Sequence, residues 1–445
     1  MNRGGKILSK VTDKNQLNGK EIKRDYLDEA VHGYNIRTAM EEAARCVLCY
    51  DAPCSKGCPA DTKPADFIRS IRFRNIKGAA ATIREANALG GCTAKVCPYD
   101  RLCEEACSRT GIDRPIQIGR LQAFAVAMEK EMNLQVFEAP KADKEKVACI
   151  GSGPASLSCA QRLAREGYKV TIFEEFEKPG GVLTYGIIPP RLPQDVVDFD
   201  IQKVKDLGVE FVMNTKVGRD ITIEDLKKQG FKAFFIGTGL WKSKEIDVKG
   251  KYMKGVTYAV DFLKKARSSN GEMKVDGEVI VIGGGDVAMD CASTAKLLGA
   301  DRVTIVYRRS IEEAPADIAE LEYVQALGVS IFTKFKPVEI LGENEKVTGL
   351  LAEGTDGFSQ LTLKADHIIF AIGQEAEDMK KIAEVELNDN GTIACDSNKG
   401  FTNIEGIFAA GDIVNGGKTV VEAVAVGKSV AESIMNYLSK KEGVQ

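Results

Sequence analysis

The sequence predicts an α/β protein that begins with an all-α, cysteine-rich domain. Two dinucleotide-binding domains follow, the second inserted in the first. Three observations lead to this fold class. Eight of the twelve cysteines lie between Cys46 and Cys107. The stretches 147–181 and 278–310 each read as strand, glycine-rich turn, helix and strand. A further strand and helix near the C-terminus complete the first of these folds after the second has ended.

Length and composition exclude several classes of function. The 445 residues allow several domains, and a net charge of −3 gives no indication of a nucleic-acid or membrane partner. The N-terminal residues MNRGGKILSK lack the apolar core of a signal peptide, and no apolar run is long enough to span a bilayer. We therefore expect a cytoplasmic protein whose clustered cysteines have metal or redox roles rather than disulfides.

The N-terminal part reads as helices around the cysteines. Residues 1 to about 30 are polar and of mixed charge, so we expect a loosely held arm with a few helical turns. Helices are predicted from near Asn35, over the amphipathic stretch Pro64 to Ala86, and from near Ile118. Residues 133 to 146 lack periodicity and read as a linker.

The cysteines form two groups with short spacings. The first group follows the pattern C-x2-C-x4-C-x3-C, and Cys-Pro pairs occur in both groups. Such loops are typical of iron–sulfur clusters, whereas structural zinc also uses C-x2-C. Spacing alone does not separate the two metals, but a neighbouring redox cofactor favours iron–sulfur. The members are Cys46, Cys49, Cys54 and Cys58, then Cys92, Cys97, Cys103 and Cys107.

The first glycine motif has the context that dinucleotide binding requires. An apolar strand from Val147 turns at Gly151-Ser152-Gly153 into a helix, and the next strand ends on Glu174. Gly151 allows the tight turn, and Gly153 lets the backbone reach a pyrophosphate at the helix N-terminus. Glu174 is placed to accept hydrogen bonds from a ribose hydroxyl. Ser156 occupies the third glycine position and still permits close packing of helix on strand.

The segment after this motif holds two further features. Gly180-Gly181 and several prolines indicate an extended loop, and Arg191 lies among those prolines. Arg191 could reach a phosphate or the edge of a flavin, or it could be a surface arginine. Phe234 to Gly239 reads as a buried strand that ends in glycines, where the chain approaches a ligand or crosses between domains.

The second glycine motif differs from the first at the end of its second strand. Gly283-Gly284-Gly285 leads into a helix, but two arginines, Arg308 and Arg309, replace the expected acid. Guanidinium groups suit a 2′-phosphate, so this pair favours NADPH over NADH. Glu312 and Glu313 lie close by and weaken that preference.

The last motif returns to the first fold. Strand-rich sequence from Val329 to Leu363 leads to Gly373, which mirrors Gly239 as a second crossing. A strand then ends at Gly411-Asp412, and a helix begins near Thr419. A carboxylate at a strand end before a helix N-terminus can hold the ribityl chain of a flavin.

Together these motifs predict hydride transfer between two cofactors. Two Rossmann-like folds, one inserted in the other, place FAD and a nicotinamide face to face, and such transfer needs positioning more than a side-chain acid. His32 and His367 have no catalytic context, so we expect no catalytic side chain. No C-x2-C adjoins either glycine motif, which disfavours a flavin disulfide reductase. Electrons are expected to leave singly through metal clusters.

The cysteine domain carries a specific family resemblance. The segments DAPCSKGCP, FIRSIRFRNIKGAA, VCPYDRLCEEAC and PIQIGRLQAF resemble the NAD(P)H-oxidising half of dihydropyrimidine dehydrogenase, a separate subunit in bacteria. The resemblance covers residues from about 40 onward, and the glutamate synthase small subunit is similar more distantly. It implies an electron-input subunit with FAD and two 4Fe-4S clusters in a hetero-oligomer. An FMN-containing partner subunit would then reduce uracil or thymine.

The resemblance also implies domains and site residues. The helical domain would span residues 1–140, the FAD-binding domain 141–243 and 375–445, and the NAD(P)H-binding domain 244–374. One cluster would take Cys46, Cys49, Cys54 and Cys107, and the other Cys58, Cys97, Cys103 and Gln122. Cys92 falls outside both sets, although local reasoning alone would leave Gln122 facing solvent. FAD contacts would be Gly151, Ser152, Gly153, Pro154, Ala155, Glu174, Gly180, Gly181, Val182, Arg191, Val217, Gly411, Asp412 and Thr419. Nicotinamide contacts would be Gly284, Gly285, Asp286, Val287, Arg308, Arg309, Ala371, Ile372 and Gly373.

Two other functions remain open from the sequence. One is a glutamate synthase small subunit, which would accompany a glutamine-hydrolysing partner. The other is a stand-alone NAD(P)H:acceptor flavin reductase whose cysteine domain is a structural zinc module.

Overall fold

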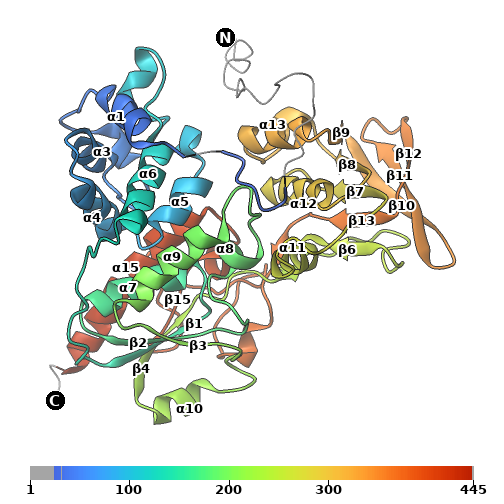
Figure 1. The fold of residues 1–445 in the computed structure, drawn as a ribbon. Coiled ribbons are helices and arrows are strands. Elements are labelled where there is room, and N and C mark those ends of the chain that lie inside the picture. The colour runs from blue at the N-terminus through green and yellow to red at the C-terminus, as the bar shows by residue number, and fades with distance from the viewer. Residues whose placement is uncertain (1–24, 32, 443–445) are drawn as a thin grey trace.

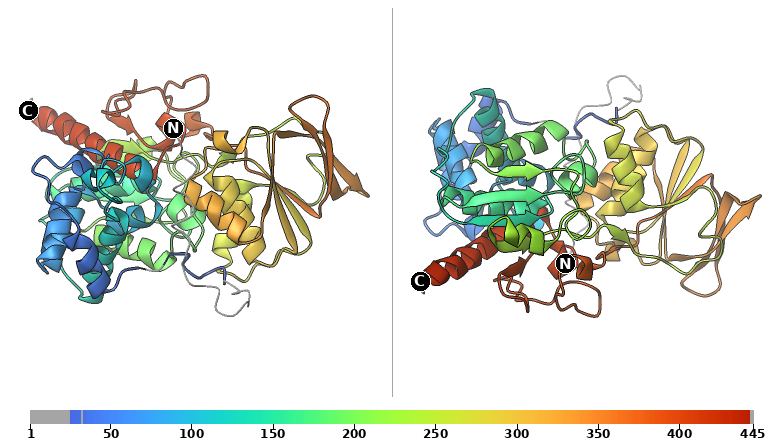
Figure 2. Two further views of the ribbon diagram at one scale, coloured as in Figure 1. Left: turned by 90° about the horizontal axis from the view of Figure 1, so that it is seen from above. Right: turned by 90° about the horizontal axis from the view of Figure 1, so that it is seen from below.

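The computed structural model describes residues 25–31 and 33–442. Figure 1 shows a helical N-terminal domain above a first parallel sheet, with a second sheet and its helices to one side. Figure 2 shows that the helical domain lies against the first sheet and that the second sheet forms the other end of the molecule.

The helical domain is built from short helices linked by the cysteine loops. Asn35 caps the first helix, because its side chain accepts a hydrogen bond from the Thr38 amide at 3.0 Å. The predicted stretch Pro64 to Ala86 is two helices rather than one, since Arg74 between them has φ of 59° and Asn75 caps the second. The helices are α1 (Ile36–Ala44), α2 (Pro53–Lys56), α3 (Pro64–Arg72), α4 (Ile76–Ala86), α5 (Gly90–Val96) and α6 (Ile118–Glu131).

The first sheet has five parallel strands in the order β15-β4-β1-β2-β3. The strands are β1 (Lys146–Ile150), β2 (Lys169–Phe173), β3 (Glu210–Val212), β4 (Phe231–Ile236) and β15 (Ile407–Ala409). The helices α7 (Pro154–Arg165), α9 (Gln194–Lys205) and α15 (Val420–Glu442) pack on one face. The short helices α8 (Val182–Tyr185), α10 (Ile223–Lys228) and α14 (Asp412–Asn415) complete this part of the chain.

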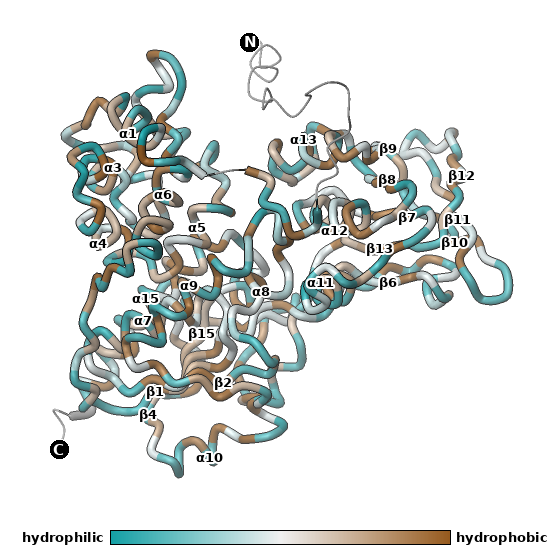
Figure 3. The backbone as a smooth tube through the Cα atoms, in the orientation of Figure 1, coloured by the Kyte–Doolittle hydropathy of each residue, from teal (hydrophilic) through white to brown (hydrophobic). Residues whose placement is uncertain are grey.

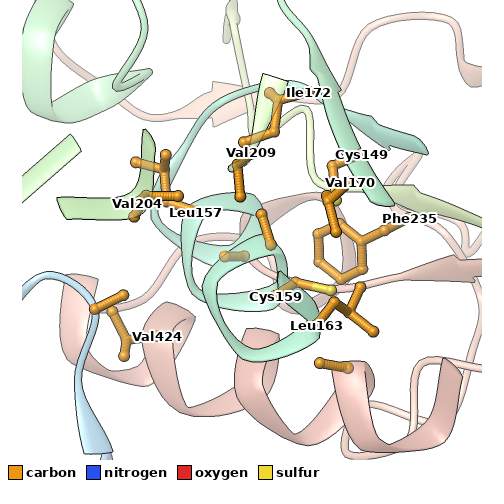
Figure 4. Close-up of a cluster of buried hydrophobic side chains, with 14 of the residues drawn as sticks. Cys149, Leu157, Cys159, Leu163, Val170, Ile172, Val204, Val209, Phe235 and Val424 are labelled. Atoms are coloured by element: carbon orange, nitrogen blue, oxygen red, sulfur yellow. The ribbon is translucent and has the colours of Figure 1, made fainter. Parts of the chain in front are cut away.

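The core of this sheet follows the alternation of side chains along β1. Cys149 points toward α7, whereas Ala148 and Ile150 point to the opposite face. Figure 4 shows Cys149 and Cys159 among aliphatic side chains from β1, β2 and α7. These two cysteines are packing residues, as cysteines in buried strands and helices commonly are.

The second sheet has the order β6-β13-β7-β8-β9 and is also parallel. Its strands are β6 (Val256–Tyr258), β7 (Glu278–Ile282), β8 (Arg302–Tyr307), β9 (Ser330–Thr333) and β13 (His367–Phe370). One face carries α11 (Ala259–Ser268), α12 (Asp286–Leu297) and α13 (Ile318–Ala326). The other face carries the antiparallel strands β10 (Phe335–Glu343), β11 (Lys346–Gly354) and β12 (Gln360–Lys364).

The predicted insertion is confirmed by the strand pairing. β15, which follows the whole second sheet in the sequence, pairs with β4 of the first sheet. The two crossings run side by side as β5 (Lys242–Ser243) and β14 (Gln374–Glu375), which pair antiparallel. Figure 3 shows apolar residues concentrated in the strands of the first sheet, around the labels β1, β2 and β15. None of the described helices is long and apolar enough to cross a membrane.

The segment 25–31 corrects the prediction of a loosely held arm. Tyr26 is 2% exposed and packs in the core of the second sheet's domain. The Ala30 amide also donates to the Pro190 carbonyl at 2.8 Å. This segment therefore ties the helical domain to the second domain, as the dark blue crossing in Figure 1 shows. Residues 1–24 and His32 lie outside the described part.

Candidate flavin, nicotinamide and cluster sites

The first glycine turn is closed against neighbouring backbone. Gly151 has φ of 89°, and a Cβ there would lie 2.8 Å from the Gly237 carbonyl oxygen. Gly153 caps α7, and Pro154 opens the helix without losing a needed donor. Ser156 is fully buried against Gly237, and its hydroxyl has no hydrogen-bond partner in the described part of the chain.

Glu174 organises this turn from the end of β2. Its carboxylate accepts hydrogen bonds from the Ser152 amide at 2.8 Å and the Phe176 amide at 2.9 Å. The Ser152 hydroxyl donates to Glu174 at 2.5 Å and accepts from the Gly180 amide at 3.0 Å. Burial raises the pKa of Glu174. The residue predicted to bind a ribose thus also joins the glycine turn to the Gly180-Gly181 loop.

Two more glycines bring distant segments to the same turn. Gly181 has φ of 56°, and a Cβ there would lie 2.9 Å from the Gly153 Cα. Gly411 has φ of 81°, and a Cβ there would lie 3.0 Å from the Ala155 Cβ. The first motif, the double glycine and the C-terminal motif therefore meet at one place.

The C-terminal motif presents a carboxylate and a helix N-terminus. Asp412 accepts from the Lys418 amide at 3.2 Å, and burial raises the pKa of this carboxyl. Thr419 precedes α15, and its hydroxyl donates to Glu422 at 2.6 Å. Val182 begins α8, and Val217 is 3% exposed in the core. A glycine turn at a helix N-terminus with a poorly paired carboxylate opposite fits a flavin dinucleotide.

Arg191 points to the second domain. Its Nη1 lies 2.8 Å from Asp290 Oδ2 on α12, and its Nε lies 2.7 Å from Glu320 Oε1 on α13. Burial alone would lower the pKa of the guanidinium, but the carboxylates of Asp290 and Glu320 outweigh it, so the pKa is raised. Arg191 is therefore an interdomain ion-pair residue in this structure, and a surface position is wrong.

The second glycine turn is tight on one side and open on the other. A Cβ on Gly283 would lie 2.2 Å from the Ala371 carbonyl oxygen, and one on Gly284 would lie 2.4 Å from the Tyr307 ring. A Cβ on Gly285 would meet only the Pro315 ring, at 3.7 Å. The Ala371 amide donates to the Ile282 carbonyl at 2.8 Å, so the segment that continues through Ile372 and Gly373 runs beside the turn.

A covering loop at this turn was missed from the sequence. The Ala316 amide donates to the Gly284 carbonyl at 3.3 Å, and the Asp317 amide donates to Asp286 Oδ1 at 2.8 Å. The proline and aspartate of the sequence APAD, residues 314–317, indicate a loop. They do not indicate that this loop folds back over the glycine turn. Val287 is 37% exposed, and Arg308 and Arg309 are exposed at the end of β8.

The first predicted set of cysteines surrounds one cavity. Cys46, Cys49, Cys54 and Cys107 line it together with apolar side chains of α3 and α6. Burial, then the neighbouring thiols, raises the pKa of Cys54 to about 11. Within residues 25–31 and 33–442, no three histidine, cysteine or acidic side chains converge as ligands of one metal ion would. Four thiols around a cavity suit a polynuclear cluster, whose ligands bind different irons.

Three cysteines of the second set are also close together. Burial raises the pKa of Cys97, and charges on Cys103 and Cys58 add to this effect. The Cys58 sulfur accepts from the Thr62 amide at 3.4 Å. The Tyr99 hydroxyl donates to the Thr93 carbonyl at 2.7 Å beside these thiols.

Gln122 and Cys92 occupy different surroundings. Gln122 is 7% exposed, so the solvent-facing position expected from local reasoning is wrong. Its amide nitrogen donates to the Gly90 carbonyl at 2.7 Å and the Thr93 hydroxyl at 3.0 Å, one turn before Cys97 on α5. Cys92 is fully buried, and its amide donates to Asp200 at 2.8 Å. After burial, Asp200 is the strongest influence that raises the pKa of this thiol.

Comparisons with known proteins agree with this arrangement. The family described as dihydropyrimidine dehydrogenase domain II, 4Fe-4S cluster, matches residues 23–134, and the pyridine nucleotide-disulphide oxidoreductase family matches residues 145–427. The structure of Mycobacterium tuberculosis FprA in complex with NADPH has a similar fold. The match covers 67% of this chain and 86% of FprA, with a TM-score of 0.57 and 18% sequence identity.

Two relatives cover nearly the whole chain. The NAD-dependent dihydropyrimidine dehydrogenase subunit PreT homolog of Salmonella typhi is 43% identical over 94% of this chain and 98% of its own. Subunit PreT of Escherichia coli K12 is 44% identical over 93% of this chain and 98% of its own. The protein is thus an NAD(P)H oxidoreductase with an FAD-type domain and a 4Fe-4S domain. It belongs to the family of the dihydropyrimidine dehydrogenase subunit PreT.

Proposed function

We propose that this chain is the electron-input subunit of a dihydropyrimidine dehydrogenase. It oxidises NAD(P)H and delivers electrons, through FAD and two 4Fe-4S clusters, to an FMN-containing partner subunit that reduces uracil or thymine. The observation that carries the proposal is the meeting of three motifs at the first glycine turn, in a chain that also surrounds a cavity with four thiols. The names of the two relatives support the substrate class and the role as a subunit.

The residues divide the work between the two nucleotide sites. When bound, FAD supplies the acceptor for a nicotinamide hydride and the route from two-electron to single-electron transfer. The turn from Gly151 to Ala155 would hold the pyrophosphate of FAD at the N-terminus of α7, and Asp412 would hold ribityl hydroxyls. The turn from Gly284 to Val287 would hold the nicotinamide dinucleotide at α12. Hydride transfer would then need positioning of the two cofactors more than a side-chain acid or base.

The two cysteine sets have an order relative to the flavin domain. Cys58 and Cys97 pack against the core of the first sheet. Cys46, Cys54 and Cys107 pack against the core of the helical domain, in which Cys103 of the second set is also buried. We infer that the second set holds the cluster nearer FAD and that the first set holds the cluster nearer the partner.

Gln122 is proposed as the fourth ligand of the second cluster, through its amide oxygen. Its amide nitrogen already donates to Gly90 and Thr93, so the amide oxygen faces away from these two residues and is left to act as a ligand. Gln122→Cys should keep the cluster and lower its potential, because a thiolate adds negative charge. Cys92→Ser should leave both clusters intact. Loss of a cluster in Cys92→Ser, with unaltered EPR spectra in Gln122→Ala, would show that Cys92 is the ligand.

Reconstitution with candidate partners tests the function as a whole. Under anaerobic conditions, NADH or NADPH should bleach the flavin absorbance of the purified chain, and the chain alone should not reduce uracil. Addition of a pyrimidine-reducing FMN subunit should restore uracil reduction, and the two chains should copurify. Copurification with a glutamine-hydrolysing subunit, or uracil-independent turnover with zinc in place of iron, would reject the proposal.

A further inference from the structure

A buried ion-pair cluster joins the two nucleotide-binding domains. Arg191, from the loop after α8 in the first domain, contacts Asp290 and Glu320 of the second domain at 2.8 Å and 2.7 Å. The side chains of Arg191 and Glu320 are each 14% exposed, and that of Asp290 is 6% exposed. Exposed ion pairs contribute little, whereas a buried pair that loses one partner leaves an uncompensated charge.

The loop that carries Arg191, and the helices on either side of it, make further contacts with the second domain. Ile188 is fully buried in the core formed by α11 and α12. Arg267 on α11 donates to the Thr184 carbonyl at 2.8 Å and to Gln194 at 2.7 Å. The hydroxyl-bearing ring of Tyr26 fills the same core from the N-terminal segment. A shift of this loop would therefore move the second domain with it.

The loop and its acidic partners are direct continuations of the two dinucleotide motifs. The loop follows Gly180-Gly181 and α8, which lie against the first glycine turn. Asp290 lies one turn into α12, whose first residue, Asp286, closes the second glycine turn. The orientation of one motif helix relative to the other motif is thus set at this cluster.

The cluster holds three carboxylates near Arg191, and Arg267 is a second cation that acts on Asp290. Asp290, Glu320 and Asp286 surround Arg191, and Asp290 Oδ1 has no hydrogen-bond partner in the described part of the chain. Burial raises the pKa of Asp290 to about 6 and that of Glu320 to about 8. Such an arrangement costs free energy, which is expected where geometry for function takes precedence over stability.

We infer that Asp290 and Glu320 are positioning residues which, through Arg191, hold the nicotinamide domain in the orientation that hydride transfer to FAD requires. The inference rests on the proposed function for its kinetic test. It does not rest on that function for its structural test. Within the described part of the chain, neither carboxylate donates to, accepts from or pairs with a glycine of the two turns, so we expect both acids to act on the reaction through the placement of the domains.

The test uses the isosteric variants Asp290→Asn and Glu320→Gln in the full chain with its cofactors. Glu278→Gln, whose carboxylate pairs with Arg302 at 3.8 Å elsewhere on the second domain, is the matched control. In stopped-flow measurements at saturating NADH or NADPH, flavin reduction should slow about tenfold in each variant, because small misplacements of reacting rings cost large factors. KM should change less than twofold, and bound FAD and iron should match the control.

Hydrogen exchange of the resting enzyme provides the second readout. Amides of residues 186–192 and of α12 should exchange at least tenfold faster in both variants than in the control, without any nucleotide substrate. Unchanged exchange and unchanged flavin reduction in Glu320→Gln would overturn the inference, even if Asp290→Asn folds poorly. If the wild type shows no flavin reduction by either nucleotide, the proposed function fails, and the exchange experiment alone decides the positioning role.

Discussion

The two glycine turns start from the same strand–turn–helix motif and end in different surroundings. The first is enclosed by Glu174, by the Gly180-Gly181 loop and by Gly411 from the far end of the chain. The second is tight at Gly283 and Gly284 but open at Gly285, with only a loop from residues 311–317 across it.

We expect this difference to separate a resident cofactor from an exchanging one. A dinucleotide in the first turn would be bordered by segments as far apart in sequence as Gly151 and Gly411, so its release should require several segments to move. A dinucleotide in the second turn can enter beside the exposed Val287 and the arginines of β8. The same local sequence pattern therefore serves two kinetic roles, and the surrounding segments decide which.

The largest expected effect comes from filling the enclosed turn. Gly181→Ala places a Cβ 2.9 Å from the Gly153 Cα at φ of 56° and should weaken FAD binding about a hundredfold, or about 2.8 kcal/mol. Gly208→Ala is the matched control, because Gly208 has φ of 87° with no neighbouring atom within 4 Å and so carries only backbone strain. Equilibrium dialysis of FAD against the apoprotein measures both. Equal affinities in the two variants would mean that Gly181 does not border the flavin.

The second effect concerns the carboxylate opposite that turn. Asp412→Ala removes a charge-assisted hydrogen bond to the ribityl chain and should weaken FAD binding about tenfold or more, on the order of 1.5 to 3 kcal/mol. FAD retained after desalting, compared with that of Asp389→Ala on an exposed turn, gives the result. Full retention in Asp412→Ala would remove this residue from the flavin site.

Substitutions beside the second glycine turn should change the preference between NADPH and NADH and leave the FAD content unchanged. Arg308→Ala with Arg309→Ala should lower kcat/KM for NADPH several-fold more than that for NADH, since both arginines are exposed where a 2′-phosphate would lie. An artificial acceptor suffices for the assay, and Lys336→Ala serves as a basic control on β10. An unchanged NADPH:NADH ratio would show that these arginines do not read the phosphate.

The last expected effect is a dependence of stability on pH at the boundary of the two domains. The pKa of Glu320 is raised to about 8, above its value near 4 in an unfolded chain, so the folded state binds the extra proton between these values. The free energy of unfolding should therefore fall as pH rises from about 5 to 8. Glu320→Gln removes this contribution, so its Tm should fall less over that range. A steeper fall in the variant would contradict the assignment.

Features that depend on local sequence patterns were predicted from the sequence. The strands and helices of both glycine motifs, the start of a helix near Asn35 and the insertion of one domain in the other all follow from periodicity and turn residues. The break at Arg74 was missed, because apolar spacing continues through it, while the positive φ of Arg74 and the cap at Asn75 divide α3 from α4.

The features that were not predicted depend on contacts between segments that are distant in the sequence. Arg191 meets Asp290 across ninety-nine positions, and nothing near either residue signals its partner. Tyr26 belongs to a polar segment by composition, yet its ring fills the core of the second domain. The proposal that Gln122 is a cluster ligand comes from family resemblance alone, since a lone glutamine on a helix has no local pattern.

Cofactor analysis of the natively purified chain tests the central claim most directly. After anaerobic gel filtration, the account predicts about one FAD per chain, about eight irons with a similar amount of sulfide, and almost no nicotinamide nucleotide. Such a composition is expected if the enclosed turn retains its cofactor, the open turn releases its own, and both cysteine sets hold clusters. A chain that retains nicotinamide in place of FAD, or that carries zinc without sulfide, would contradict the account.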